Sequence, residues 1–389
     1  MKLNDQALEM LRNVFSYYSS FEEFYNDRPF GLNFDSEEDA KELFDAAKDD
    51  DFWYLTMYYI SSDSLVIKGQ NKTLDDIKEE LNNKDISKYK RIILELDNKN
   101  YPGIEDLNDI NIDIYVKYSG TPGFCSIDEF TNMRAFFNTF METYPTENLS
   151  SLEKITLAYD HVKFFEYQDV DDPEHSLDSR NMAKIFKTGN IVCVGYTYLF
   201  CQLLKEMGIE SAVMSVLDTE ENDGFAHARA IVNITDAKYN INGLYIFDPT
   251  WDSSEEMYLI ETPDGKRYYD NELDNDEKII KELPRTISYN YFLIPAYEYK
   301  KYFPNEIIDT FEMYPSNKEV GITSDLNVDV LSSEGSKFSE IINILPDVLR
   351  TTKRIEGMSE DKIDEYIDDA MNLIIKKRFN IMSSTHRFN

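Results

Sequence analysis

The chain has 389 residues, of which 42% are hydrophobic, so it is long enough to form two or three domains with substantial cores. Its 74 acidic side chains outnumber the 40 basic ones, and the net charge of -34 repels phosphate backbones and anionic lipid, which argues against nucleic acid and membranes as partners. Aromatic residues make up 14% of the chain, which excludes the low-hydrophobicity composition of a disordered protein.

The cysteine content and the N-terminal residues indicate in which cellular compartment the protein lies. Cys125, Cys193 and Cys201 are too few and too widely spaced for a disulfide scaffold or a zinc-binding CxxC pair. Asp5 and Glu9 stand where a signal peptide needs an apolar segment, and the longest nearly uncharged apolar stretch is shorter than the roughly 20 residues that cross a bilayer. We therefore expect a cytoplasmic protein.

Residues 1–145 combine helical and strand patterns. The sequence predicts an amphipathic helix near Leu8 and strands from Arg91 (RIILELD) and Ile112 (IDIYVKY), which together indicate an N-terminal α+β module of unknown role. We interpret the acidic run at 49–51 as a solvated surface rather than a metal site.

A second unit is predicted over residues 146–312. Ser150 and Glu153 form a capping box, and a further helix is expected to start near Cys193 and to end at Gly208. Strand-like runs then begin at Ala212, His227 and Leu244. Helices followed by strands indicate an α+β fold rather than a βαβ alternation.

The remaining segments carry no predicted cofactor. The acidic loop with Asp169, Asp171 and His175 lacks the glycine that a calcium-binding EF-hand loop needs at its sharp turn, so we expect no metal there and no cofactor in the protein. Residues 313–389 are expected to form a polar linker and a helical C-terminal extension, whose strongest helix begins at Ser359.

Cys193 is the residue with the most chemical interest. At the first turn of its predicted helix, unpaired backbone N–H groups and the positive dipole end favour a thiolate. A thiol nucleophile also needs a base, and that base needs an acceptor that holds its ring. Cys125 and Cys201 lack these surroundings, and we interpret both as packing residues.

His227 and Asp248 are the natural partners of this thiol. Apolar residues alternate along GFAHARAIVNI, so His227 and Arg229 point to the opposite side of the strand, which we expect to line a cleft. Asp248 ends the next strand, immediately before a proline. Neighbouring antiparallel strands lie about 4.8 Å apart, so the imidazole and the carboxylate can meet.

The order of these elements resembles the transglutaminase-like superfamily over about residues 148–254. The resemblance is carried by Cys193, Gly195, Tyr196, His227, Asp248, Pro249, Thr250 and Trp251. It implies a papain-like α+β core and a catalytic triad of Cys193, His227 and Asp248. Many relatives continue the histidine as H-A-W-N, whereas this chain has Arg229 in place of the aromatic residue, and we expect Arg229 to change what the cleft accepts.

The chemistry implied is acyl transfer at an amide of a protein or peptide. Water as acceptor makes the protein a cysteine peptidase, deamidase or other amidase, and an amine makes it a cross-linking transferase; we favour hydrolysis because no calcium loop is visible to control cross-linking. A binding module that keeps the fold without turnover is the alternative. The sequence leaves the oligomeric state open.

The walls of the site are less defined by the sequence. The backbone N–H of Cys193 is expected to bind the oxyanion, and the second donor stays open among Asn190, Asn181 and Tyr196. We interpret Trp251 as a packing residue beside the site in preference to a substrate contact.

Overall fold

The computed structural model describes Lys41 and most residues from 64 to 384. The gaps within that range are residues 90, 119–123, 169–177, 219–225, 254–256, 271–276 and 315–337. The chain divides into an N-terminal unit, residues 1–135 with 170–188, and a C-terminal unit, residues 136–169 with 189–389.

Several expectations fall outside the described residues. They concern the helix near Leu8, the acidic run at 49–51, the loop with Asp169, Asp171 and His175, and most of the predicted linker after residue 313.

The N-terminal unit contains a four-stranded sheet in the order β1-β2-β3-β4. Its strands are β1 (Ser64–Lys68), β2 (Arg91–Leu96), β3 (Asp113–Tyr118) and β4 (Cys125–Ser126). The first three run parallel, and β4 runs antiparallel to β3. Strands β2 and β3 confirm the two strands expected from the sequence, and the connections between the parallel strands cross over through helices, as parallel pairing requires.

The N-terminal unit also contains several short helices. They are α5 (Leu74–Asn82), η3 (Ile86–Lys88), η4 (Ile104–Asp109), η6 (Asp178–Arg180) and α8 (Met182–Thr188), while α6 (Ile127–Thr143) continues into the C-terminal unit. Cys125 is 1% exposed, and its thiol donates to the Val116 carbonyl. Cys125 is therefore part of the core, as the sequence predicted.

The C-terminal unit is built on a five-stranded antiparallel sheet in the order β13-β9-β8-β7-β14. Its strands are β7 (Ser211–Asp218), β8 (Ala226–Asp236), β9 (Ile241–Phe247), β13 (Ile294–Pro295) and β14 (Glu306–Tyr314). Strands β7, β8 and β9 confirm the three strand-like runs of the sequence. Their β-branched and aromatic residues suit a buried pleated surface.

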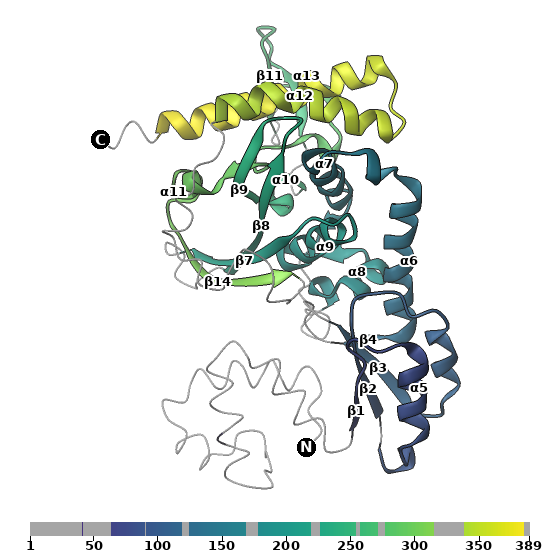
Figure 1. The fold of residues 1–389 in the computed structure, drawn as a ribbon. Helices are drawn as coiled ribbons and strands as arrows, with labels where there is room; N and C mark the ends of the chain where they lie inside the picture. The colour runs from purple at the N-terminus through teal and green to yellow at the C-terminus, as the bar shows by residue number, and fades with distance from the viewer. Residues whose placement is uncertain are drawn as a thin grey trace. The chain divides into compact units, whose positions relative to one another are not determined.

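Helices cover both faces of this sheet (Figure 1). On one side lie α7 (Ser151–Val162), which starts with the predicted Ser150–Glu153 capping box, and α9 (Cys193–Glu206). Gly208 follows α9 at a φ of 75°, a left-handed conformation that glycine adopts without strain. On the other side lies α11 (Tyr299–Tyr302).

The second covered face corrects an expectation. The side of β8 that carries His227 and Arg229 also carries Ile231, which packs in one apolar cluster with Met214 and Phe303. The pattern along β8 predicted that this side would line a cleft. The chain instead returns over it between residues 294 and 303, so most of that face is interior.

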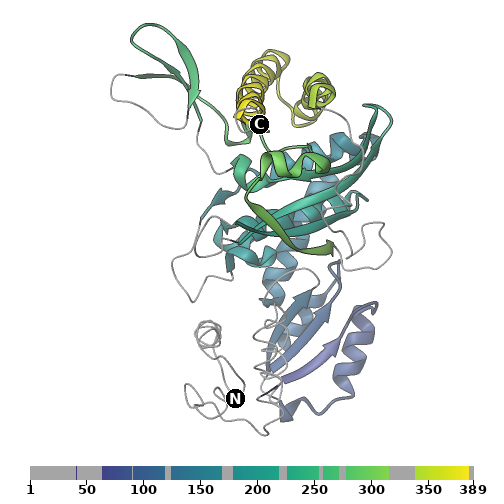
Figure 2. The ribbon, with the colours of Figure 1, turned by 90° about the vertical axis from the view of Figure 1, so that its left-hand side faces the viewer.

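Smaller elements complete the unit. They are η5 (Thr146–Asn148), β5 (Glu166–Tyr167), β6 (Asn190–Ile191), α10 (Pro249–Ser253), β10 (Tyr258–Glu261), β11 (Arg267–Asp270), β12 (Lys278–Glu282), η7 (Arg285–Ile287) and η8 (Ala296–Glu298). Strands β10, β11 and β12 form a separate sheet beside the C-terminal helices (Figure 2). There, the Tyr269 hydroxyl donates to Asp369 at 2.8 Å.

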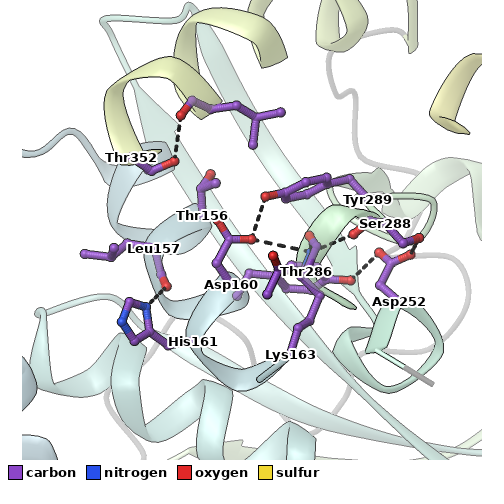
Figure 3. Close-up of polar contacts among 12 residues, drawn as sticks. Thr156, Leu157, Asp160, His161, Lys163, Asp252, Thr286, Ser288, Tyr289 and Thr352 are labelled. Atoms are coloured by element: carbon purple, nitrogen blue, oxygen red, sulfur yellow. Dashed lines mark hydrogen bonds and ion pairs between the residues drawn. The ribbon is translucent and has the colours of Figure 1, made fainter. Parts of the chain in front are cut away.

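The C-terminal helices α12 (Phe338–Ile355) and α13 (Glu360–Ser384) are held by buried charges, and α13 confirms the helix expected from Ser359. Asp160 of α7 lies 2.8 Å from Lys353 Nζ of α12 and accepts a 2.6 Å bond from the Tyr289 hydroxyl. Lys163 donates to the Thr286 and Ser288 carbonyls at 2.6 Å. Figure 3 shows the α7 side of this network, in which side chains of distant segments satisfy one another.

Among the helices that the structure describes, none is both long and apolar enough to pass through a bilayer.

The network makes a prediction about stability. Replacement of Lys353 by methionine removes the cation that Asp160 and Glu356 share and leaves only Lys163, 3.4 Å from Asp160, to balance the two carboxylates. Breaking a buried ion pair costs about 3–5 kcal/mol. We therefore expect Lys353→Met to lower the free energy of unfolding of the C-terminal unit by that amount in urea denaturation. The neighbouring Arg354→Ala is the control, because Arg354 makes its ion pair with Glu360 at the surface and its loss leaves the transition nearly unchanged. Equal transitions for the two variants would contradict this account.

Candidate active site

Cys193 is the first residue of α9, and its side chain is partly exposed. The residue before it, Val192, offers no side-chain cap, so the first backbone N–H groups of the helix have no acceptor within it. The Thr197 hydroxyl lies 2.9 Å from the Cys193 carbonyl and 3.0 Å from the Ala228 carbonyl. This hydroxyl ties the start of α9 to strand β8, beside His227.

His227 and Asp248 meet directly. His227 Nε2 lies 2.8 Å from Asp248 Oδ2, and both side chains are buried. Strands β8 and β9 are paired as far as Ala230 and Phe247, so Asp248 follows the last paired residue of β9 and reaches back toward the start of β8. Cys193 also interacts with this pair, because a hydrogen bond with His227 and the charge of His227 lower the pKa of the Cys193 thiol.

Asp248 is fixed from several directions. Its Oδ1 accepts the backbone N–H of Trp251 at 3.1 Å, and its own N–H donates to the Tyr291 carbonyl at 3.1 Å. The Tyr159 hydroxyl bridges the Asp248 carbonyl at 2.8 Å and a carboxylate oxygen of Asp252 at 2.6 Å. The carboxylate that faces His227 is therefore held by its own backbone and by helix α10.

The charges of the site favour an ion pair of thiolate and imidazolium. Burial alone lowers the pKa of His227, but the charge of Asp248 and the hydrogen bonds from Asp248 and Cys193 outweigh it and raise that pKa to about 9. Burial alone raises the pKa of the Cys193 thiol, but His227 and the backbone N–H of Ala228 bring it below its ordinary value. Asp248 has a lowered pKa: burial raises it, and the cations of His227 and Arg229 more than reverse that.

Arg229 does not line a cleft. Its side chain is 0% exposed, and it lies between the carboxylates of Asp248 and Glu306. The expectation that it changes what the cleft accepts is therefore wrong for this structure. The physical reason is that two carboxylates neutralise the guanidinium, which allows it to be buried.

The other predicted wall residues have different surroundings. Tyr196 is buried, and its hydroxyl donates to the Phe165 carbonyl at 2.6 Å. Asn181 belongs to the N-terminal unit, where its side-chain oxygen accepts bonds from Tyr118 and Ala183. Asn190 is partly exposed in β6, close before Cys193 in sequence, and stays a candidate for the second oxyanion donor.

Trp251 lies beside the site. Its ring stacks on the His227 ring with centroids 5.3 Å apart and an interplanar angle of 27°, and it also meets the rings of Tyr291 and Phe303. These contacts agree with a packing role. Cys201, in the same helix as Cys193, is 0% exposed and belongs to the core, as predicted.

Three residues near the site were not found from the sequence. They are Tyr159, Asp252 and Glu306. Asp252 was visible as the last residue of DPTWD, but its role depends on partners that are distant in the chain, such as Ser288. Nothing local distinguishes Glu306 from the many other acidic residues.

The described residues contain no group of three or more histidine, cysteine or acidic side chains that could hold a metal ion. The arrangement of Cys193, His227 and Asp248 has the parts for nucleophilic chemistry. A thiolate can attack an electrophilic carbon, the imidazolium can give a proton to the departing group, and the carboxylate keeps the ring charged and oriented.

Comparison with known proteins agrees with this geometry. No curated protein gives a significant match to the chain. A family model described as a transglutaminase-like domain matches residues 139–261, a stretch that includes Cys193, His227 and Asp248. The fold is α+β, as the sequence predicted, and residues 139–261 match a transglutaminase-like domain, which supports the resemblance to the transglutaminase-like superfamily.

Proposed function

We propose that this protein is an enzyme that transfers acyl groups from an amide of a protein or peptide through a thioester on Cys193. The observation that carries the proposal is the buried contact of 2.8 Å between His227 and Asp248 beside a partly exposed thiol. The buried carboxylate raises the pKa of His227 to about 9, so the imidazole carries its proton near neutral pH, where it stabilises the thiolate.

The reaction follows from these positions. The Cys193 thiolate adds to the amide carbonyl carbon, and the resulting oxyanion is stabilised by the free backbone N–H groups at the start of α9. The C–N bond then breaks as the His227 imidazolium gives its proton to the departing nitrogen, which leaves a thioester on the sulfur. Water, deprotonated by the neutral imidazole, attacks the thioester and releases the acid, and the thiolate and the imidazolium are restored.

Hydrolysis is the proposed outcome, and an amine in place of water gives the cross-linked product instead. The two outcomes share every step up to the thioester, so they differ in which acceptor reaches it. A protein-binding module without turnover would need none of the charge arrangement around His227.

The first test is the reactivity of the thiols. At pH 7, we expect iodoacetamide to alkylate Cys193 at least about tenfold faster than Cys125 and Cys201, because Cys193 is partly exposed and its pKa is lowered, whereas the other two are buried. Burial also raises the pKa of the Cys125 thiol far above its ordinary value. His227→Ala should remove this advantage. Rates from peptide mass spectrometry that are equally slow for all three thiols would favour the binding module.

The second test is turnover. A proteome-derived peptide library incubated with the protein should gain new carboxyl groups, seen by mass spectrometry as cleaved or deamidated peptides. Cys193→Ala should reduce their formation at least about 10³-fold, since a triad loses nearly all of its rate with its nucleophile. Cys201→Ala serves as the matched control, because it removes a buried thiol from the same helix. Addition of the amine dansylcadaverine separates the two outcomes. If the label is incorporated in a Cys193-dependent way in place of hydrolysis, the reaction is cross-linking and not hydrolysis.

The third test is the pH dependence. The lowered pKa of Cys193 places the acid limb of turnover below the ordinary range of a thiol, where protonation removes the nucleophile. As the pH rises through the His227 pKa of about 9, the imidazolium is lost and the departing amine receives no proton, so turnover falls. Alkylation needs no proton donor and should not fall there. If both rates decline together above pH 9, the assignment of His227 as the acid is wrong.

A further inference from the structure

Arg229 contacts the carboxylate of the proposed triad directly. Its Nε atom lies 2.8 Å from Asp248 Oδ2, the same oxygen that His227 Nε2 approaches to 2.8 Å. The Arg229 contact is an ion pair without the alignment of a hydrogen bond, whereas the His227 contact has that alignment. The oxygen is therefore shared between two cations, and its hydrogen bond is directed to the histidine.

Glu306 completes the charge balance on the other end of Arg229. The guanidinium NH1 and NH2 groups bind both oxygens of Glu306, the latter at 2.8 Å, which is the fork geometry that arginine makes with carboxylates. The Tyr299 hydroxyl donates to Glu306 Oε2 at 2.8 Å. Glu306 is the first residue of β14, so its position is fixed by the edge strand of the sheet.

Aromatic rings restrict the guanidinium further. Arg229 Cζ lies 3.8 Å from the centroid of the Phe303 ring and 4.6 Å from that of Trp251. Trp251 is also the ring that stacks on His227. The Trp251 ring thus contacts both His227 and Arg229, the two cations that share the Asp248 oxygen. Movement of either side chain would disturb its packing on that ring.

From these contacts we infer that Arg229 and Glu306 are positioning residues of the acyl-transfer site. Arg229 holds Asp248 Oδ2 in place against His227, and Glu306 balances Arg229 so that the guanidinium does not draw the carboxylate away from the imidazole. The inference rests on the proposed function, since it assigns roles around the same reacting groups. It extends the site from three residues to a chain of alternating charges that ends on strand β14.

The electrostatic consequence can be measured at His227. The charged groups that face this ring are Cys193 from α9, Asp248 from the end of β9 and Arg229 from β8, and Trp251 of α10 packs on its face. Among these groups, Arg229 lowers the pKa of His227 and Asp248 raises it. Removal of Arg229 should therefore raise the His227 pKa, and removal of the Glu306 charge, which balances Arg229, should lower it.

The experiment compares Glu306→Gln, Arg229→Met and the double variant, with ¹³C-histidine NMR as the readout. The chain has only 4 histidines, and the His227 signal is identified by its loss in His227→Gln. Glu306→Gln leaves Arg229 unbalanced and should lower the His227 pKa from about 9, Arg229→Met should raise it, and the double variant should lie between. A variant with a lower His227 pKa should need a higher pH before iodoacetamide alkylates Cys193, because less imidazolium is present to stabilise the thiolate. A variant with a higher His227 pKa should show the opposite shift.

Glu298→Gln is the matched control, because it removes a buried carboxylate from the preceding turn whose ion pair is with Lys301 and not with Arg229. Opposite shifts in the two single variants support the inference. Shifts in the same direction, or none beyond that of Glu298→Gln, would mean that the pair is only structural and would overturn it. If Arg229→Met does not fold, the comparison of Glu306→Gln with Glu298→Gln decides alone. An ordinary His227 pKa and slow Cys193 alkylation in the unmodified protein would instead reject the proposed function itself.

Discussion

A carboxylate that is removed from water must be paired with a cation or with hydrogen-bond donors. In this protein, the buried carboxylate on which the site depends is that of Asp248. The side chain is 0% exposed, and it stays charged because His227 and Arg229 both contact its Oδ2 atom. The charge of His227 depends in turn on Asp248, and the state of the Cys193 thiol depends on His227. The pKa of a partly exposed thiol is therefore influenced by a buried carboxylate through His227.

The pairing of buried polar groups also holds the C-terminal helices to the rest of the unit. Lys353 reaches from α12 to Asp160, and Arg378 of α13 donates to the carbonyls of Tyr289 and Asn290. That loop holds the proposed site, because the next carbonyl, that of Tyr291, accepts the backbone N–H of Asp248. Charged side chains from the last helices thus hold the backbone that contacts Asp248.

Local patterns in the sequence predict the parts of the site, and long-range contacts decide their surroundings. The start of α9 at Cys193 and the pairing of β8 with β9 follow from helix signals and strand alternation. The burial of Arg229 does not, because it depends on Glu306, 77 residues later. Tyr196 is likewise one of the candidates for the second oxyanion donor, and the sequence does not show that its hydroxyl donates to the Phe165 carbonyl, 31 residues earlier. Periodicity shows which residues share a face, and it does not show what covers that face.

The burial of the base has a consequence for the choice of acceptor. His227 is 4% exposed and its ring stacks on that of Trp251, whereas its neighbour Cys193 is partly exposed. If a thioester forms on that sulfur as proposed, the acyl group takes up part of the space through which an acceptor approaches the imidazole. Water, the smallest acceptor, then has the least steric barrier to the imidazole, whereas an amine on a protein needs room for its carbon chain. Access to His227, more than the strength of the nucleophile, should therefore separate hydrolysis from cross-linking in this site.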